Sequence, residues 1–329
     1  MKEFLQTLTN GQHLGREEAK KLILLMTNGN AKASLISSIL TAYNFLSPNL
    51  EEIKGFREAL YERTEFIDLS DYNPMDMCGT GGDGKDTFNI STLSAIVVSS
   101  FSIPIAKHGN YGSSSVCGSS NVLEYLGYNF KQTPKEIKEE MDKNQLCFIH
   151  APHFHSCLRH VAPVRKSLGI KTIFNLLGPL VNPCQPKIQC SGVYNLDVLR
   201  QYHYLLQESH EKHSLVHSLD GYDEITLTGK FKLLTSEEEL LLQPDDLELS
   251  TVYPKDIKGG KTIKESAAIF TKILQGKGSA RQNSVVAINS AVAMHCYKPE
   301  QSITQHYEYA LESLRSGKPY QKLRKSIYA

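Results

Sequence analysis

The sequence has almost no net charge, because 36 basic residues are balanced by 35 acidic ones and the formal charge at pH 7 is +1. A chain without a strong field of one sign is not drawn as a whole to nucleic acid or to an anionic membrane. We therefore expect no nucleic-acid partner. Any anionic ligand must be held by local groups.

The sequence also has no apolar run of the roughly 20 residues that a membrane-spanning helix needs, and no signal-type apolar segment near its start. No CxxC pair occurs among its cysteines, which are Cys78, Cys117, Cys147, Cys157, Cys184, Cys190 and Cys296. Their scatter argues against a zinc ribbon or a disulfide framework. We expect reduced cysteines in a cytoplasmic protein without a membrane partner.

The first 65 residues show only helical patterns. In segment 16–30 charged residues come first, apolar residues follow at three-and-four spacing, and Gly29 acts as a stop signal. Segments 33–46 and 49–64 continue in the same way. We predict a small helical domain over residues 1–65, with part of 160–185 packing on it.

From residue 66 to 329 strand-like and helical patterns alternate. The strand-like segments are 75–78, 103–109, 146–151, 188–195 and 215–219. Alternation of this kind is typical of an α/β domain whose central sheet is mostly parallel. The predicted fold class is therefore α/β, with a small N-terminal helical domain and a larger α/β domain.

A glycine-rich segment, CGTGGDGKDTFNIST, spans residues 78–92. Its letters satisfy the dinucleotide fingerprint GxGxxG, but that motif requires a helix to open at the loop and an acid about 20 residues on. Here Lys107 and His108 stand in that region. The segment also nearly spells a Walker A loop, yet Asp86 follows Lys85 where Ser or Thr is required. Both interpretations are poor.

The physics common to both motifs remains. Glycines allow backbone N–H groups to converge on an anion, and Asn89, Ser91 and Thr92 are cap-type residues at a helix start. The alternative is a structural strand-to-helix turn with an ordinary cap. The density of small residues favours an anion-binding loop.

A second loop, residues 107–119, has the same character and adds a cation, Lys107. It ends at another helix start near Ser119. Alone it could be a surface loop with a solvated lysine. Because the two loops follow consecutive strands, both should lie at the carboxyl edge of a parallel sheet. A ligand with two separate phosphate clusters would fit there.

Asp223 and Glu224 lie between two strand-like runs, 215–219 and 225–229. Adjacent acids after a glycine are more often a solvated turn. With two phosphate loops nearby, a magnesium site becomes the better interpretation, because Mg²⁺ prefers one or two carboxylates plus substrate oxygens and water. Such an ion would neutralise a diphosphate leaving group.

The segment 148–183 concentrates histidines and arginines. The histidine spacing matches no standard zinc pattern, so we reject a zinc site. An arginine could bind the carboxylate of a small aromatic acid through two hydrogen bonds, which lysine could not imitate. Arg159 and Arg165 are both candidates, and the sequence pattern does not choose between them.

Taken together, these stretches resemble the anthranilate phosphoribosyltransferase family. The matching motifs include CGTGGDG, NIST, KHGN, SSNVLEYLG, VRKSLGIKTIFNLLGPL and DGYDEITLTG, in order over nearly the whole chain. The resemblance implies a nucleoside-phosphorylase-like architecture that forms a homodimer through its helical domain. It implies transfer of a phosphoribosyl group from 5-phosphoribosyl-1-diphosphate to anthranilate with Mg²⁺, the second step of tryptophan biosynthesis.

The resemblance also implies three sets of site residues. Phosphoribosyl diphosphate would contact Gly79, Gly82, Asp83, Thr87, Asn89, Ser91, Thr92, Lys107, Ser113, Ser114, Ser115 and Ser119. Anthranilate would contact Gly79, His108, Asn110, Pro152, His155, Arg165 and Gly178. Magnesium would be held by Ser91, Asp223 and Glu224. Asp83 is the candidate that would help with the proton of the amine.

Three positions depart from the family pattern: Tyr111 stands where arginine is common, Asn121 where aspartate is common, and Lys261 where an acid is frequent. Two alternatives remain beside the main interpretation. One is an enzyme like the pyrimidine nucleoside phosphorylases, against which the GTGGDG…NIST run argues. The other is a non-catalytic homologue that binds nucleic acid, against which the near-neutral charge argues.

Overall fold

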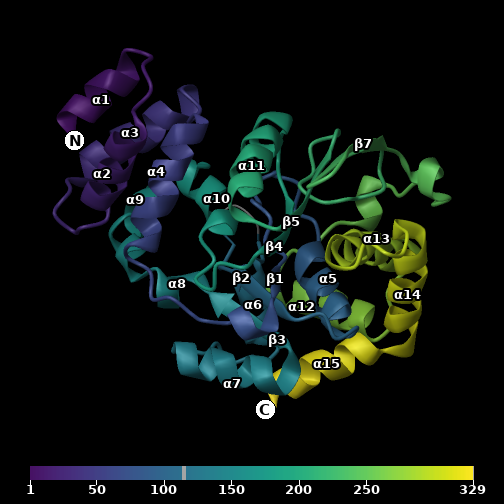
Figure 1. Ribbon diagram of the computed structural model, residues 1–329. Helices are drawn as coiled ribbons and strands as arrows, with labels where there is room; N and C mark the ends of the chain where they lie inside the picture. The colour runs from purple at the N-terminus through teal and green to yellow at the C-terminus, as the bar shows by residue number, and fades with distance from the viewer. Residues whose placement is uncertain (113–115, 329) are drawn as a thin grey trace.

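The structure is a computed structural model that describes residues 1–112 and 116–328. Four helices form a bundle at one side of the molecule (Figure 1): α1 (Lys2–Thr9), α2 (Arg16–Met26), α3 (Ala33–Phe45) and α4 (Leu50–Tyr61). Ser113, Ser114 and Ser115 lie outside the described residues.

A buried carboxylate ties the bundle together. Glu52 is fully buried, and its two oxygens accept from the backbone N–H of Leu14, the hydroxyl of Tyr43 and the N–H of Asn49, each at 2.9 Å. The side chain of Asn49 accepts in return from the N–H of Glu52, which completes a capping box at the start of α4. A buried acid that is fully hydrogen-bonded in this way can fix the packing of three segments.

A seven-stranded sheet lies at the centre of the larger part, with the strand order β3-β2-β1-β4-β5-β6-β7. The strands are β1 (Met75–Asp76), β2 (Ile105–Gly109), β3 (Leu146–His150), β4 (Ile188–Gly192), β5 (Lys212–Ser218), β6 (Phe231–Thr235) and β7 (Glu239–Leu242). The pairs from β3 to β5 are parallel, and β6 and β7 are antiparallel. The prediction of a mostly parallel sheet is confirmed.

The predicted strand-like run 225–229 is wrong. Leu227 has a φ of +59°, which a strand cannot accommodate. Both backbone groups of Ile225 bond to the side chain of Asn289, its N–H at 3.1 Å and its carbonyl at 2.8 Å. These groups are therefore not available for a sheet ladder, and the antiparallel strand after β5 begins only at Phe231.

Helices cover both faces of the sheet (Figure 1). Along β3, Leu146 and Phe148 join the larger apolar core, whereas Cys147 and Ile149 join a smaller core on the opposite face, as the alternation of a strand requires. The further helices are α5 (Ile90–Ser99), α6 (Ser119–Tyr125), α7 (Pro134–Asn144), α8 (Ala151–Phe154), α9 (Ala162–Leu168), α10 (Ile173–Leu177), α11 (Leu196–Ser209), α12 (Ile263–Leu274), α13 (Ala280–Tyr297), α14 (Ile303–Ser316) and α15 (Lys318–Ile327). Short 3₁₀ turns occupy Ser70–Tyr72, Ser156–His160, Gly178–Leu180, Pro244–Leu247 and Pro254–Asp256.

The bundle is packed onto the α/β part rather than separated from it. Val161, Ile173 and Leu177 belong to the same apolar core as Leu22 and Phe56 of the bundle. Helix α11 adds polar contacts to α4, with Lys54 bonded to Glu208 at 2.8 Å and Arg57 to Ser209 at 3.1 Å. Among the described residues no helix is both long and apolar enough to cross a bilayer.

Candidate active site

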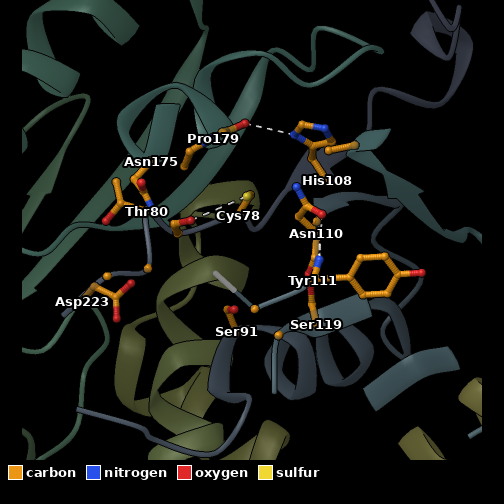
Figure 2. A pocket seen from close by; sticks show the side chains of 18 of the residues that line it. Cys78, Thr80, Ser91, His108, Asn110, Tyr111, Ser119, Asn175, Pro179 and Asp223 are labelled. Atoms are coloured by element: carbon orange, nitrogen blue, oxygen red, sulfur yellow. Dashed lines mark hydrogen bonds between the residues drawn. The ribbon is translucent and has the colours of Figure 1, made fainter. Parts of the chain in front are cut away.

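A cavity of about 280 Å³ opens where β1 and β2 end, between the sheet and the segment that contacts the bundle. Figure 2 shows side chains from both glycine-rich loops around it, with Asp223 and Thr80 on one side and His108, Asn110 and Tyr111 on the other. Because β1 and β2 are adjacent and parallel, the predicted meeting of the two loops at one sheet edge is confirmed. Every described residue of the expected phosphoribosyl-diphosphate set lines this cavity.

The first loop has the backbone that its glycines allow. Gly81, Gly82 and Gly84 have φ values of +61°, +77° and +72°, a region that other residues seldom adopt. Asn89 occupies the N-cap position of α5, but its side chain does not cap the helix. Its Nδ2 instead donates to the carbonyl of Cys117 at 2.9 Å, so Asn89 ties the first loop to the second.

Lys107 places a positive charge between the two loops. It is only 3% exposed, and its Nζ donates to the carbonyl of Met77 and lies 3.5 Å from the hydroxyl of Ser91. Among the described residues no carboxylate within 4.0 Å forms an ion pair with it. Its charge acts on the buried carboxyls of Asp76 and Glu224 without a direct ion pair, so its ammonium can still bind an anionic ligand.

Three acids, Asp83, Asp223 and Glu224, form the carboxylate wall of the cavity. Burial, followed by the charge of Asp83, raises the pKa of Asp223, and burial, followed by the charge of Asp223, raises the pKa of Glu224. Glu224 accepts from the backbone N–H of Ser91 at 3.2 Å, while one oxygen of Asp83 is buried without a partner. Crowded carboxylates of this kind are stabilised by a cation.

The carboxylate wall suits magnesium, although no cluster of three or more His, Cys, Asp or Glu side chains among the described residues forms a complete metal site. Magnesium does not need one, because it keeps water and substrate oxygens beside one or two carboxylates. Asp223, Glu224 and the Ser91 hydroxyl line the same cavity. These residues therefore fit an ion that a phosphorylated ligand helps to hold.

Gly192, which has no side chain, sets the position of Asp223. A Cβ atom on Gly192, the last residue of β4, would lie 1.4 Å from the carbonyl oxygen of Asp223, so only glycine fits there. The carbonyl of Gly192 also accepts from the N–H of Thr80 at 2.9 Å. The end of β4 thus fixes the positions of both the first loop and the acid pair.

His108 and His155 form the histidine wall, at the other end of the cavity. Nδ1 of His108 is 2.9 Å from the carbonyl of Gly178, while its buried Nε2 has no partner. Nδ1 of His155 is 2.8 Å from the Thr64 hydroxyl, and its Nε2 is 2.8 Å from the carbonyl of Val181. Burial lowers the pKa of His108 to about 3 and that of His155 to about 4. Both rings are therefore neutral at pH 7.

The structure separates the two arginine candidates. Arg165 lines the cavity, with its guanidinium 5.4 Å from the centroid of the Phe174 ring, and burial lowers its pKa. Arg159 contacts His160 at 3.3 Å and is not part of the lining. Arg165, unlike Arg159, is thus placed to bind a carboxylate inside the cavity.

The other expected anthranilate contacts mostly reach the cavity. Gly79, Asn110 and Gly178 line it. Pro152 is exposed and lies outside the lining, where Ala151 contributes instead.

The three residues that depart from the family pattern occupy different places relative to the cavity. Tyr111 lines it and donates to Glu124 at 3.3 Å. Asn121 accepts from the N–H groups of Gly112 at 2.9 Å and Gly118 at 3.0 Å, so it closes the base of the second loop. Lys261 donates its N–H to Glu265 before α12, and it is not in the lining.

Sequence reasoning missed several lining residues. Lys85 lies in the segment that resembles a Walker A loop, and a lysine inside an anion-binding loop is itself a signal of phosphate binding. Phe174 and Asn175 also line the cavity. They lie far from the loops in sequence, and although the motif VRKSLGIKTIFNLLGPL contains them, nothing in it marks these two residues as facing the cavity.

Known proteins share both the sequence and the architecture. Residues 71–320 match the glycosyl transferase family, a/b domain, and residues 2–64 match the helical bundle domain of the same family. The anthranilate phosphoribosyltransferase of Cytophaga hutchinsonii is 46% identical over 99% of this chain and 100% of its own length.

Two solved structures have the same fold. The anthranilate phosphoribosyltransferase of Thermus thermophilus superposes with a TM-score of 0.89 at 30% identity, covering 98% of both chains. The enzyme of Saccharomyces cerevisiae in complex with PRPP and Mg superposes with a TM-score of 0.89 at 25% identity, covering 99% of this chain and 97% of that one. The chain belongs to the anthranilate phosphoribosyltransferase family of glycosyl transferases.

Proposed function

We propose that this protein transfers the phosphoribosyl group of 5-phosphoribosyl-1-diphosphate to anthranilate, which yields N-(5-phosphoribosyl)anthranilate and diphosphate in the second step of tryptophan biosynthesis. One observation carries the proposal. A single cavity, lined by both glycine-rich loops and by Arg165, has a carboxylate wall at one end and neutral histidines at the other. The end with the carboxylate wall suits phosphoribosyl diphosphate with its metal, and the end with the histidines suits anthranilate.

Phosphoribosyl diphosphate would lie across the two loops. The Gly79–Asp83 loop and the start of α5 line the cavity, together with Thr87, Asn89, Ser91 and Thr92. Lys107 would bind an anionic group between the loops, and Ser119 would contribute from the second loop. Ser113, Ser114 and Ser115 belong to the same proposed set from the sequence resemblance.

The charges lining the cavity explain a magnesium requirement. Its described lining holds the cations Lys85, Lys107 and Arg165 and the anions Asp83, Asp86, Asp223 and Glu224. A diphosphate would lie beside these acids, so a divalent cation that binds both the acids and the diphosphate would favour its binding. Mg²⁺ bound by Ser91, Asp223 and Glu224 would supply charge neutralisation of the leaving diphosphate.

Anthranilate would lie between the histidine wall and Arg165. Its carboxylate would pair with the guanidinium, which is sheltered from water and thus binds more strongly than an exposed one. Because Nδ1 of His108 faces a carbonyl, that nitrogen carries the proton and the unpartnered Nε2 can accept an N–H. His108 would therefore orient the amine. Gly79, Asn110, His155 and Gly178 would contact the ring, with Pro152 at the margin.

The reaction would be a displacement at C1 of the ribose. The amine nitrogen forms the new bond to C1 while the bond from C1 to the diphosphate oxygen breaks. The aromatic amine is already a nucleophile, so alignment in the cavity supplies much of the rate. The nitrogen then loses one proton, and Asp83, whose free oxygen is buried near the loops, would accept it.

The proposal extends to the oligomeric state of the protein and to its location in the cell. We propose a cytoplasmic homodimer that forms through the helical bundle, where Phe45 at the end of α3 is 89% exposed. An exposed aromatic ring of this kind is a candidate contact between subunits. The molar mass by light scattering, compared between wild type and Phe45→Asp, tests it, and a monomeric wild type would refute it.

The first experiment follows anthranilate fluorescence with purified protein, phosphoribosyl diphosphate and Mg²⁺. The proposal predicts a loss of fluorescence that requires both the diphosphate substrate and the metal. A protein that leaves anthranilate unchanged, but cleaves a nucleoside with inorganic phosphate, would instead be a nucleoside phosphorylase.

A further inference from the structure

A lysine without an assigned role lies beside the carboxylate wall. Lys85 lines the cavity, and its ammonium lies 4.9 Å from the centroid of the Tyr222 ring. Tyr222 directly precedes Asp223 in the chain. The side chain of Lys85 is exposed, so it is a mobile positive charge next to the proposed magnesium ligands.

The backbone at Lys85 is held on both sides. Its N–H donates to the side chain of Asp83 at 3.0 Å. On the following side, the N–H of Gly259 donates to the carbonyl of Asp86 at 2.8 Å, and that of Phe88 donates to Ile257 at 3.1 Å. These hydrogen bonds hold the backbone from which the exposed side chain of Lys85 extends.

The ammonium group of Lys85 has a weak partner that a ligand could replace. Among the described residues no carboxylate within 4.0 Å pairs with it, although four acids line the same cavity. It contacts the face of Tyr222 instead. A cation–π contact at an exposed site is weaker than a charge-assisted hydrogen bond to a phosphate oxygen. An arriving phosphate group would therefore draw the ammonium away from the ring.

We infer that Lys85 binds the diphosphate group of phosphoribosyl diphosphate and stabilises it as it leaves. This inference rests on the proposed function. Because Tyr222 adjoins Asp223, the ammonium lies near the end of the cavity where magnesium would hold the diphosphate. A positive charge at that place stabilises the negative charge that grows on the departing oxygen when the bond to C1 breaks.

The test compares Lys85→Met and Lys85→Arg with a matched control, Lys255→Met. Lys255 is also exposed and also lies over a tyrosine, 5.7 Å from the Tyr253 centroid, but it is outside the cavity. Kinetics with each substrate are combined with calorimetric binding of magnesium diphosphate. Lys85→Met should raise the Kd for magnesium diphosphate and the KM for phosphoribosyl diphosphate about tenfold, the loss of one such contact.

The same variant should change the KM for anthranilate less than about twofold, because that substrate lies at the other end of the cavity. Lys85→Arg should retain most of the affinity, and Lys255→Met should match wild type. Equal diphosphate binding by Lys85→Met and Lys255→Met would overturn the inference. An equal loss of affinity for ribose 5-phosphate would overturn the assignment to the diphosphate end.

The binding arm separates this inference from the proposed function. A wild-type protein that does not turn over anthranilate would count against the proposed function. The calorimetric comparison of Lys85→Met with Lys255→Met would still decide whether Lys85 binds diphosphate, since it needs no reaction.

Discussion

The two walls of the cavity respond oppositely to the same cause. Burial raises the pKa of Asp223 and Glu224 and lowers the pKa of His108 and His155, because it disfavours the charged form of any group. The histidines face backbone carbonyls that satisfy a neutral ring. The acids face one another. The protein thus satisfies most of the histidine wall by itself and leaves only Nε2 of His108 without a partner, whereas we propose that a cation arriving with the substrate completes the carboxylate wall.

The strongest test of this difference between the two walls is to neutralise the carboxylate wall with the double substitution Asp223→Asn/Glu224→Gln. Magnesium-dependent turnover should fall by about 10³-fold or more, since stabilisation of the leaving group is lost. Without ligands, the double variant should be more stable to urea than wild type at pH 8, because two buried repelling charges are gone. Fluorescence assays and urea titrations measure the two effects.

Asp220→Asn provides the control for that experiment, because Asp220 is an exposed acid in the same turn. It should keep wild-type activity. Retention of magnesium-stimulated turnover in the double variant would show that these acids do not hold the metal.

The next largest effect is expected at the proposed anthranilate site, where Arg165→Lys should raise the KM for anthranilate about 50-fold. Lysine is a point charge and cannot reproduce a planar pair of hydrogen bonds to a carboxylate. The KM for phosphoribosyl diphosphate should change little. Arg159→Lys is the matched control, and a larger effect from it would reverse the assignment made from the structure.

Acid should destabilise the histidine wall. Because the pKa of His108 is lowered to about 3, its contribution is complete above the unfolded-state pKa near 6.5 and is lost as the pH falls toward 3. Between pH 7 and pH 4.5 this amounts to about 2 kcal/mol of unfolding free energy. Urea titrations of wild type and His108→Gln across this range should show a flatter dependence in the variant. Parallel curves would mean that His108 is not buried as a neutral ring.

The smallest effect tests how the bundle supports the histidine wall. Thr64 follows α4, and its hydroxyl lies 2.8 Å from Nδ1 of His155. Thr64→Val should lower the unfolding free energy by about 1 kcal/mol, because one buried ring nitrogen loses its partner. Thr9→Val, at an exposed site on α1, should cost less. Equal losses in thermal unfolding would argue against a specific role for the Thr64 hydroxyl.

Most features that the sequence predicted are local ones. The glycine loop and the strand that ends in KHG are each encoded in consecutive residues, and both form as expected. The choice of Arg165 over Arg159 depends on which face of a short segment turns to the cavity. The run 225–229 failed because Asn289, more than 60 residues away, takes its hydrogen bonds. A contact that follows from the sheet topology is predictable from the sequence, such as the meeting of the two loops at one edge, whereas a contact set by one distant side chain is not.

Because Gly192 packs against the backbone of Asp223, we expect that substituting this residue without functional groups would affect activity as strongly as substituting the acid itself. Adding one methyl group there would displace the backbone of the acid rather than its charge. A survey that scored every substitution by activity would place Gly192 among the residues of the reaction, and a chemical search for reactive groups would never find it. In this fold, empty space at the end of β4 is as much a requirement for the chemistry as the carboxylates beside it.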